Sequence, residues 1–459
     1  MEKQDDIPAK QRSEEDAVPP KDEMPRESLI DRIRPFILVF LLVFLPIALF
    51  HAFTDYMYVY RVPAGTTVVD RSMVKSHSRL GEYLAGLKWT KEHPWIEPYL
   101  GYRHYIIPDG ATELRSAFQW NLNVVSVTIP DSVTKISRMG FRGCKKLKSV
   151  TLPSGITDIP EQLFWECEAL RFFRIPDGVK TIGLGAFQDC FKLRKIVIPD
   201  SVETIAPGAF GHCLELREIV LPDSLKEIPD YMCADCANLT GIRIPDGVTA
   251  IGREAFLRCL SLREIAIPDS VSKIGDRAFD RCESLERVRI PSGVTAIGSD
   301  AFKQCAALRE AEILGGIDRI DVRTFMGCSS LKKAVIQAGV KRIWDEAFSG
   351  CAALEEIALP DGLLSIDHEA FSGCEALEKI DFPATLETIE SFAFYHCTSL
   401  KKVVIPPAMK EIHYGAFSDC SALSDVEFTP PSADGPKMYI DSHAFMRTAV
   451  PPEKIPKSR

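Results

Sequence analysis

Cysteine thiols are the most frequent groups in this sequence that could perform chemistry. The chain has 14 cysteines, and 13 of them occupy one position of a 23-residue period. These 13 are Cys144, Cys167, Cys190, Cys213, Cys236, Cys259, Cys282, Cys305, Cys328, Cys351, Cys374, Cys397 and Cys420. Thiols can pair as disulfides, bind a metal or remain free, and the spacing of the cysteines indicates which of these states is favoured.

Regular spacing favours free thiols. Equivalent cysteines on stacked units point in the same direction, whereas a disulfide needs Cβ atoms that face each other about 3.8 Å apart. The one Cys-x2-Cys pair, Cys233 and Cys236, has no second pair to complete a zinc site. We therefore expect buried free thiols that act as small hydrophobic side chains and weak hydrogen-bond donors, with no metal and no cofactor. Disulfides are the alternative.

Groups for acid–base or nucleophilic catalysis are not organised in this way. The chain has nine scattered histidines, of which only His212 and His396 share a position of the period. It lacks the zinc-protease, nucleophile-elbow and glycine-rich nucleotide-binding motifs. We predict that the protein is not an enzyme and has no catalytic residues. Its 55 basic against 64 acidic residues, a net charge of -9, also argue against nucleic-acid binding.

The elements that position the thiols form a sequence repeat. Phenylalanine recurs every 23 residues from Phe118 to Phe417, three residues before the cysteine position. Cys233 replaces one of these phenylalanines, and Asn121 replaces the first cysteine. Three residues after the cysteine position comes a leucine, followed by an alternating apolar run that usually ends in proline. The register is too regular to arise by chance.

The pattern within one repeat predicts a strand and two turns. Along Leu262–Ile267 the apolar residues alternate with polar or small ones, so we expect them to point inward from a short strand. Pro268 ends the strand because it lacks an N–H donor. Val271 then re-enters the core, and a short helical turn places Phe279 and Cys282 inside. One such coil cannot bury its apolar face, but stacked coils can. The sequence therefore predicts a β-rich solenoid with a parallel sheet, of about 15 repeats over residues 106–450.

The repeat unit from Ile267 to Leu285, IPDSVSKIGDRAFDRCESL, closely resembles the BspA-like class of leucine-rich repeat. The resemblance covers roughly Ile107 to Phe445. It implies a right-handed leucine-rich-repeat superhelix and a surface-exposed or secreted protein, often of host-associated microbes, that is used in adhesion to proteins or cells. It implies no catalytic residues.

The amino-terminal part differs from the repeats. Residues 1–34 mix charges and prolines, which predicts a disordered cytoplasmic tail. Residues 35–54 carry no Asp, Glu, Lys or Arg and are long enough to cross a membrane as one transmembrane helix. A buried soluble helix and a cleaved signal peptide are the alternatives. Because Arg32 and Arg34 directly precede the span, we expect the repeats to lie outside the cytoplasm.

Two further segments flank the repeats. Residues 55–105 do not match the repeat, and we expect them to form a juxtamembrane segment and a cap over the first coil, because solenoid ends need covering. An independent ligand domain is the alternative. The aromatic residues of this expected cap are Trp89, Trp95, Tyr99, Tyr102 and Tyr105. We expect the tail at 451–459 to be disordered.

The outward positions of the predicted sheet contain one candidate binding site. They hold charged, small or aliphatic residues except at Phe172, which sits between arginines, and Trp165 lies in the preceding turn of the same coil. Exposed aromatic residues flanked by arginines are typical of binding hot spots. The alternative is that Phe172 packs flat on Ser149 or Lys195. The candidate ligand-binding residues are Trp165, Arg171, Phe172, Arg174, Arg194 and Arg217.

These expectations combine into one functional hypothesis. The sequence predicts a membrane-anchored, non-catalytic surface protein that is bound to the membrane through residues 35–54. Its sheet face would bind a macromolecule, and the basic residues favour an acidic extracellular protein or an anionic glycan. The alternative is a structural envelope or scaffold protein with no specific soluble ligand.

Overall fold

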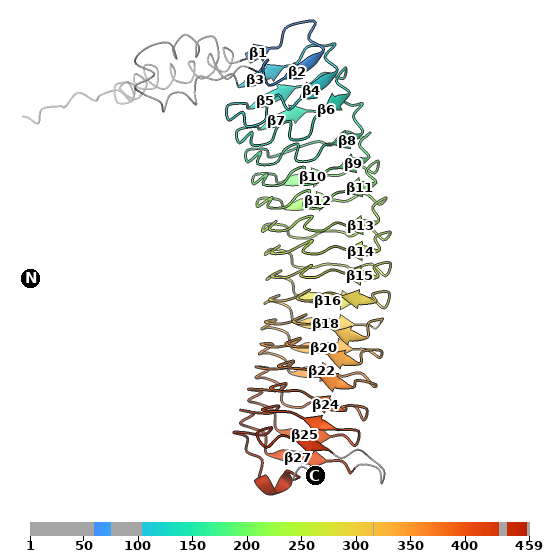
Figure 1. Ribbon diagram of the computed structural model, residues 1–459, viewed down its shortest axis with the longest axis vertical. Coiled ribbons are helices and arrows are strands. Elements are labelled where there is room, and N and C mark those ends of the chain that lie inside the picture. The colour runs from blue at the N-terminus through green and yellow to red at the C-terminus, as the bar shows by residue number, and fades with distance from the viewer. Residues whose placement is uncertain (1–58, 75–102, 315, 431–437, 457–459) are drawn as a thin grey trace, which may run out of the picture. The chain divides into compact units, whose positions relative to one another are not determined.

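The computed structural model describes residues 59–74, 103–314, 316–430 and 438–456. These residues wind into a solenoid whose coils stack along one axis (Figure 1). The predicted tail at 1–34 and the predicted membrane helix at 35–54 lie outside the described residues. Within the described ranges, no helix has the length and apolar character that a membrane crossing requires.

Two ladders of parallel strands run along the solenoid, with partners at equivalent positions of successive coils, such as Ile196 and Ile219. The ladder that we call the first sheet face comprises β1 (Val59–Arg61), β3 (His104–Ile106), β5 (Ser126–Thr128), β7 (Ser149–Thr151), β10 (Lys195–Val197), β12 (Glu218–Val220), β16 (Arg287–Ile290), β18 (Glu310–Ile313), β20 (Lys333–Ile336), β22 (Glu356–Ala358), β25 (Lys402–Ile405) and β27 (Asp425–Phe428). Its strands are the ones that the alternating pattern of each repeat predicts.

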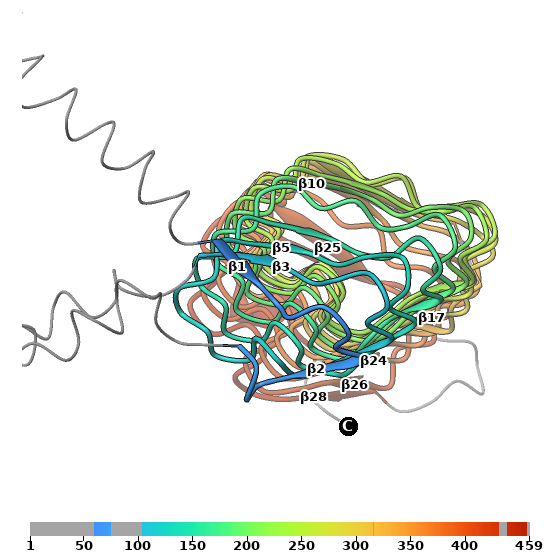
Figure 2. The same ribbon diagram turned by 90° about the horizontal axis from the view of Figure 1, so that it is seen from above.

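A second sheet face follows the proline turn of each coil, where the sequence predicted only a return to the core. It comprises β2 (Val68–Asp70), β4 (Glu113–Arg115), β6 (Lys135–Ile136), β8 (Asp158–Ile159), β9 (Thr181–Ile182), β11 (Thr204–Ile205), β13 (Glu227–Ile228), β14 (Ala250–Ile251), β15 (Lys273–Ile274), β17 (Ala296–Ile297), β19 (Arg319–Ile320), β21 (Arg342–Ile343), β23 (Ser365–Ile366), β24 (Thr388–Ile389), β26 (Glu411–Ile412) and β28 (Tyr439–Ile440). Viewed down the stack, β1, β3 and β5 line one side and β2, β26 and β28 line another (Figure 2).

The third side of each coil is the Phe–Cys turn, which runs from two residues before the repeat phenylalanine to the cysteine. In the coil of Phe279, Arg277 and Arg281 have φ angles of 54° and 59°. An α-helix needs negative φ throughout, so the predicted short helical turn is wrong. The Phe279 N–H donates to the carbonyl oxygen of Ala301 in the next coil at 2.8 Å. Backbone hydrogen bonds between coils therefore stabilise this side as well.

The repeat phenylalanines and cysteines fill the core. The rings of Phe279 and Phe302 stack with centroids 5.1 Å apart and an interplanar angle of 6°. All 14 cysteines are buried and unpaired, which confirms the predicted burial. The Cys282 thiol donates to the carbonyl oxygen of Phe256 in the preceding coil at 3.3 Å. Burial raises the pKa of the Cys144 thiol to about 12 and also raises the pKa values of the Cys190 and Cys282 thiols, so these thiols are neutral and unreactive at physiological pH.

Both ends of the solenoid add structure that the repeat pattern does not contain. β1 pairs with β3, and β2 pairs with β4, so residues 59–74 extend both sheet faces beyond the first repeat. The ring of Tyr60 meets that of Tyr105 edge-on with centroids 5.8 Å apart. The tryptophans of the expected cap lie outside the described residues. At the other end, the segment predicted to be disordered contains η3 (Pro452–Lys454), and Lys454 forms an ion pair with Asp425 at 2.9 Å.

Candidate functional site

Phe172 lies on the first sheet face, between β7 and β10, where the ladder is interrupted. Its side chain is 66% exposed, and its backbone forms an isolated parallel bridge with Lys195. The next residue, Phe173, points inward, and its ring packs against those of Phe164 and Phe187 at centroid distances of 4.9 and 5.1 Å. Phe173 is therefore part of the core, whereas the packing of the core does not involve the exposed ring of Phe172.

Two exposed valines extend the apolar surface of Phe172 along the solenoid. Val197 is 50% exposed and Val220 is 41% exposed, and the two pair directly across β10 and β12. Because Phe172 pairs with Lys195, Val197 is its diagonal neighbour, about 7–8 Å away between backbones. The sequence did not single out these valines, because they are aliphatic residues on an alternating strand. We call Phe172, Val197 and Val220 the Phe172 patch.

Arginines flank the Phe172 patch, and two of them have no ion-pair partner among the described residues. These two, Arg171 and Arg217, are exposed. Arg194 pairs with Glu215 at 2.8 Å and holds the pKa of that carboxyl group below its usual value. Arg174 pairs with Asp177 at 3.3 Å, although both side chains are highly exposed. The structure thus brings four of the predicted arginines to one face and leaves two of them available to an acidic partner.

Trp165 lies apart from this group, on the Phe–Cys turn. Its indole N–H donates to a carboxylate oxygen of Asp189 at 2.7 Å. The guanidinium of Arg142 lies over its ring, 4.1 Å from the centroid. Trp165 and Phe172 belong to the same coil but to different sides of it. Five of the six predicted site residues therefore share the first sheet face, and Trp165 belongs to a separate surface.

The Phe172 patch borders a hollow in the first sheet face. After Val220, the next coil places Gly241 at an outward position, and its Cα is open to solvent on the side where a Cβ would stand. A hollow of about 630 Å³ opens there, with Glu218, Arg243 and Glu264 among its lining residues. Apolar surface, a depression and two arginines without ion-pair partners among the described residues thus lie within a few coils of one another.

The later coils of the first sheet face have a different surface. Ion pairs join successive coils at Arg287–Glu310 (3.5 Å), Lys332–Glu355 (3.1 Å), Lys333–Glu356 (3.1 Å) and Glu378–Lys401 (2.7 Å). Arg287, Glu310, Lys333 and Glu356 form one column whose signs alternate, and Lys332, Glu355, Glu378 and Lys401 form the adjacent column, in which opposite charges also meet. Such exposed pairs contribute little to stability, but they neutralise the charges that they join.

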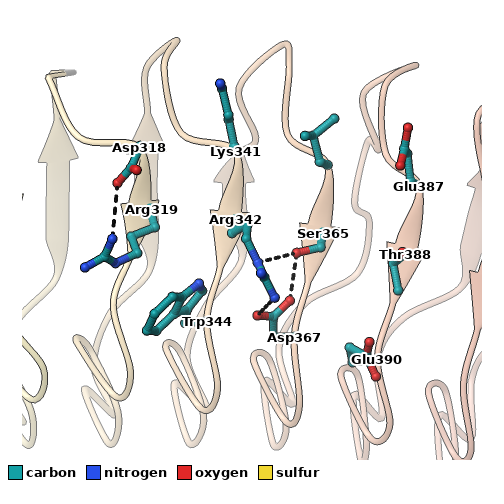
Figure 3. Close-up of a pocket in the computed structure, with 11 residues that line it drawn as sticks. Asp318, Arg319, Lys341, Arg342, Trp344, Ser365, Asp367, Glu387, Thr388 and Glu390 are labelled. Carbon is teal, nitrogen blue, oxygen red and sulfur yellow. Dashed lines mark hydrogen bonds and ion pairs between the residues drawn. The ribbon is translucent and has the colours of Figure 1, made fainter.

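A groove of about 490 Å³ on the second sheet face was not predicted (Figure 3). Trp344 lies in it between Arg319 and Arg342, whose guanidinium groups are 4.7 and 5.9 Å from the ring centroid. Arg342 also pairs with Asp367 at 2.8 Å. The signal in the sequence was a tryptophan at a position where neighbouring coils carry glycine or acidic residues. Because these charges are satisfied within the groove, it is a weaker candidate than the Phe172 patch.

Comparison with known proteins identifies the repeats. The family model described as "BspA type Leucine rich repeat region (6 copies)" matches residues 114–240, 226–355 and 341–458. A leucine-rich repeat protein from Bacteroides ovatus is 29% identical, with a TM-score of 0.67, over 71% of this chain and 86% of its own. One from Eubacterium ventriosum is 24% identical, with a TM-score of 0.47, over 76% of this chain and 92% of its own.

A third solved structure is described as a leucine rich cell surface protein from Faecalibacterium prausnitzii. It is 27% identical, with a TM-score of 0.41, over 71% of this chain and 88% of its own. No curated protein matches the chain. The family model covers well over half of the sequence, and its matches coincide with the coils described above. The chain therefore belongs to the BspA-type leucine-rich-repeat family.

Proposed function

We propose that this chain is a membrane-anchored, non-catalytic surface protein that binds an acidic macromolecule through the Phe172 patch. The observation that carries the proposal is the exposed ring of Phe172, next to exposed valines and to two arginines without ion-pair partners among the described residues. An acidic extracellular protein is the favoured partner, because aromatic residues and arginine are enriched in protein interfaces. An anionic glycan is the second candidate.

The physical roles of the two residue types differ. Covering Phe172, Val197 and Val220 removes apolar surface from water, which supplies affinity. Arg171 and Arg217 attract an acidic partner during approach and fix its register. An affinity that depends on these arginines falls as salt increases, because exposed charges are screened within about 8 Å at physiological ionic strength.

Membrane anchoring and an extracytoplasmic repeat domain are part of this proposal. They rest on the uncharged stretch at 35–54 and on Arg32 and Arg34 before it. Protease added to intact cells should remove the repeats, and lysis should not be required. Repeats that survive until lysis would contradict this orientation.

Site-directed cross-linking tests the binding surface. We would place a benzophenone amino acid at Phe172 of the full-length chain on cells and, as the matched control, at Val404, which is also exposed on a first-face strand. We expect a cross-linked product from position 172 that disappears with excess poly-glutamate or heparin and at high salt. The absence of that product, or equal products from both positions, would favour a scaffold without a specific ligand.

A further inference from the structure

A hollow of about 300 Å³ on the Phe–Cys turns lies outside the Phe172 patch. Its floor is made by Gly185 and Gly208, two residues before the repeat phenylalanines of successive coils, and by Gly211, one residue after. Coils on either side carry Gln162 and Tyr231 at the position of the first two glycines. Missing side chains in two successive coils therefore create the space, and we call it the glycine hollow.

The left-handed backbone conformation at Gly185 and Gly208 favours glycine without excluding other residues. The two glycines have φ angles of 55° and 64°, but Gln162 and Tyr231 adopt the same conformation, at 53° and 57°. A Cβ on Gly185 would also lie 3.1 Å from the side-chain oxygen of Gln188, which would have to shift. A Cβ on Gly208 would meet nothing closer than the side-chain oxygen of Gln188 at 3.8 Å. A side chain at this position would fit the fold and fill the hollow. The lack of a side chain at Gly208 therefore leaves open a space that Gln162 and Tyr231 occupy in the coils on either side.

Aromatic rings wall the glycine hollow at both ends, and each ring is held in place. Trp165 is fixed by its hydrogen bond to Asp189 and by Arg142, which covers the ring from the preceding coil. Tyr231 is 37% exposed, and Arg253 lies 5.9 Å from its ring centroid. The two aromatic residues are three coils apart, or about 14 Å at the usual strand spacing.

The polar groups of the glycine hollow carry no unpaired charge. The Gln188 carboxamide has no hydrogen-bond partner within the described residues, and its oxygen lies 3.1 Å from where a Cβ on Gly185 would stand. His212 is held between carboxylates of Asp189 at 3.0 Å and Asp235 at 3.3 Å. A free amide can donate to and accept from adjacent hydroxyl groups at the same time.

We propose that the glycine hollow binds a neutral sugar unit of a glycan. The apolar C–H faces of a sugar ring match the aromatic walls, and its hydroxyl groups match the free amide of Gln188. The absence of an unpaired charge among the lining residues disfavours a sulfated or carboxylated sugar. The volume of about 300 Å³ lies at the lower end of the range for small-ligand pockets, about 300–1,000 Å³. This site is independent of the Phe172 patch.

The test uses the full-length chain in a detergent without a sugar headgroup. Neutral oligosaccharides of glucose, galactose, mannose and N-acetylglucosamine are titrated by calorimetry, with sialyllactose as the anionic comparison. Gly208→Gln and Gly211→Leu fill the hollow with side chains that equivalent positions already hold as Gln162 and Leu257. We expect at least one neutral oligosaccharide to bind, and each filling variant to weaken it at least about tenfold.

Two controls separate binding from folding. Glu346→Gln places glutamine at the position equivalent to Gly208 in a distant coil, and Met326→Ala is the matched control for Trp165→Ala. We expect Trp165→Ala to weaken binding and both controls to bind normally. Gly208→Gln should melt at a slightly lower temperature, because a side chain at positive φ is strained, and both filling variants should remain folded at the assay temperature. The proposal is overturned if no neutral oligosaccharide binds, if the filling variants bind normally, or if they abolish capture of a protein partner instead.

Discussion

The early and late coils of the first sheet face share one interior and differ in their exterior. Phe164 stacks on Phe187 at 5.3 Å much as Phe279 stacks on Phe302 at 5.1 Å. Outside, the coils around Phe172 combine exposed apolar side chains with two arginines that lack ion-pair partners among the described residues, although Lys195 and Glu218 pair there at 2.7 Å. The later coils carry more ion pairs between successive coils. The repeat therefore constrains the inward residues alone. Binding function has to be sought where outward residues depart from the pattern of the other coils.

The largest effect should come from alkaline pH, because the thiol column runs through both regions. Burial raises the folded-state pKa of Cys144 to about 12, whereas an unfolded thiol ionises near 8.5. Between these values the unfolded state holds fewer protons than the folded state, so stability falls as pH rises. Each such thiol contributes up to about 1.4 kcal/mol per pH unit.

We expect the melting temperature to drop steeply between pH 8.5 and 11, in early and late coils alike. Hydrogen exchange at several pH values would resolve the two regions. A flat profile in this range would mean that the thiols are not buried neutral groups. Alkylation offers a second readout, with almost no labelling of the native chain and 14 labels after denaturation without reductant.

Removal of a core ring should have the next largest effect. Phe279→Ala should lower the free energy of unfolding by about 3–5 kcal/mol, because it leaves a cavity in the phenylalanine stack. Phe164→Ala should cost a similar amount, since its ring has the same kind of neighbours. Denaturant unfolding, with hydrogen exchange to locate the loosened coils, checks both. A large loss of unfolding free energy for only one of these two variants would contradict a core that is equally well packed in early and late coils.

Removal of exposed charges should have the smallest effect on stability. Lys333→Ala breaks the pair with Glu356 and should cost less than about 1 kcal/mol, because both partners are exposed. Arg217→Ala breaks no ion pair among the described residues and should leave the melting temperature unchanged. A larger loss for Arg217→Ala than for Lys333→Ala would show that Arg217 has a structural role and would weaken the contrast.

The repeat was predictable from sequence because every coil presents the same side chains to the core. Phe279 and Cys282 could be assigned inward from their period alone. The left-handed backbone conformation in the Phe–Cys turn could not be predicted, since an arginine such as Arg277 gives no local indication of positive φ. The strands in residues 59–74 were missed because this coil lacks the phenylalanine and cysteine that mark the others.

The candidate site was only partly predictable. Phe172 stood out because it is aromatic, but its continuation through Val197 and Val220 depends on strand register, which places residues of different coils side by side. Trp165 was grouped with Phe172 by proximity in sequence, although a turn separates the sides on which they lie. Which arginines lack partners depends on side-chain geometry, and residue types alone did not distinguish Arg194 from Arg217.

One affinity comparison tests the central claim most directly. The partner identified by cross-linking is titrated against full-length Phe172→Ala/Arg217→Ala and against the matched late-coil variant Val404→Ala/Lys333→Ala. We predict at least about a tenfold weaker affinity for the early variant, a weaker salt dependence, and wild-type affinity for the late one. Equal affinity of the two variants, with both folded, would contradict the assignment of binding to the Phe172 patch.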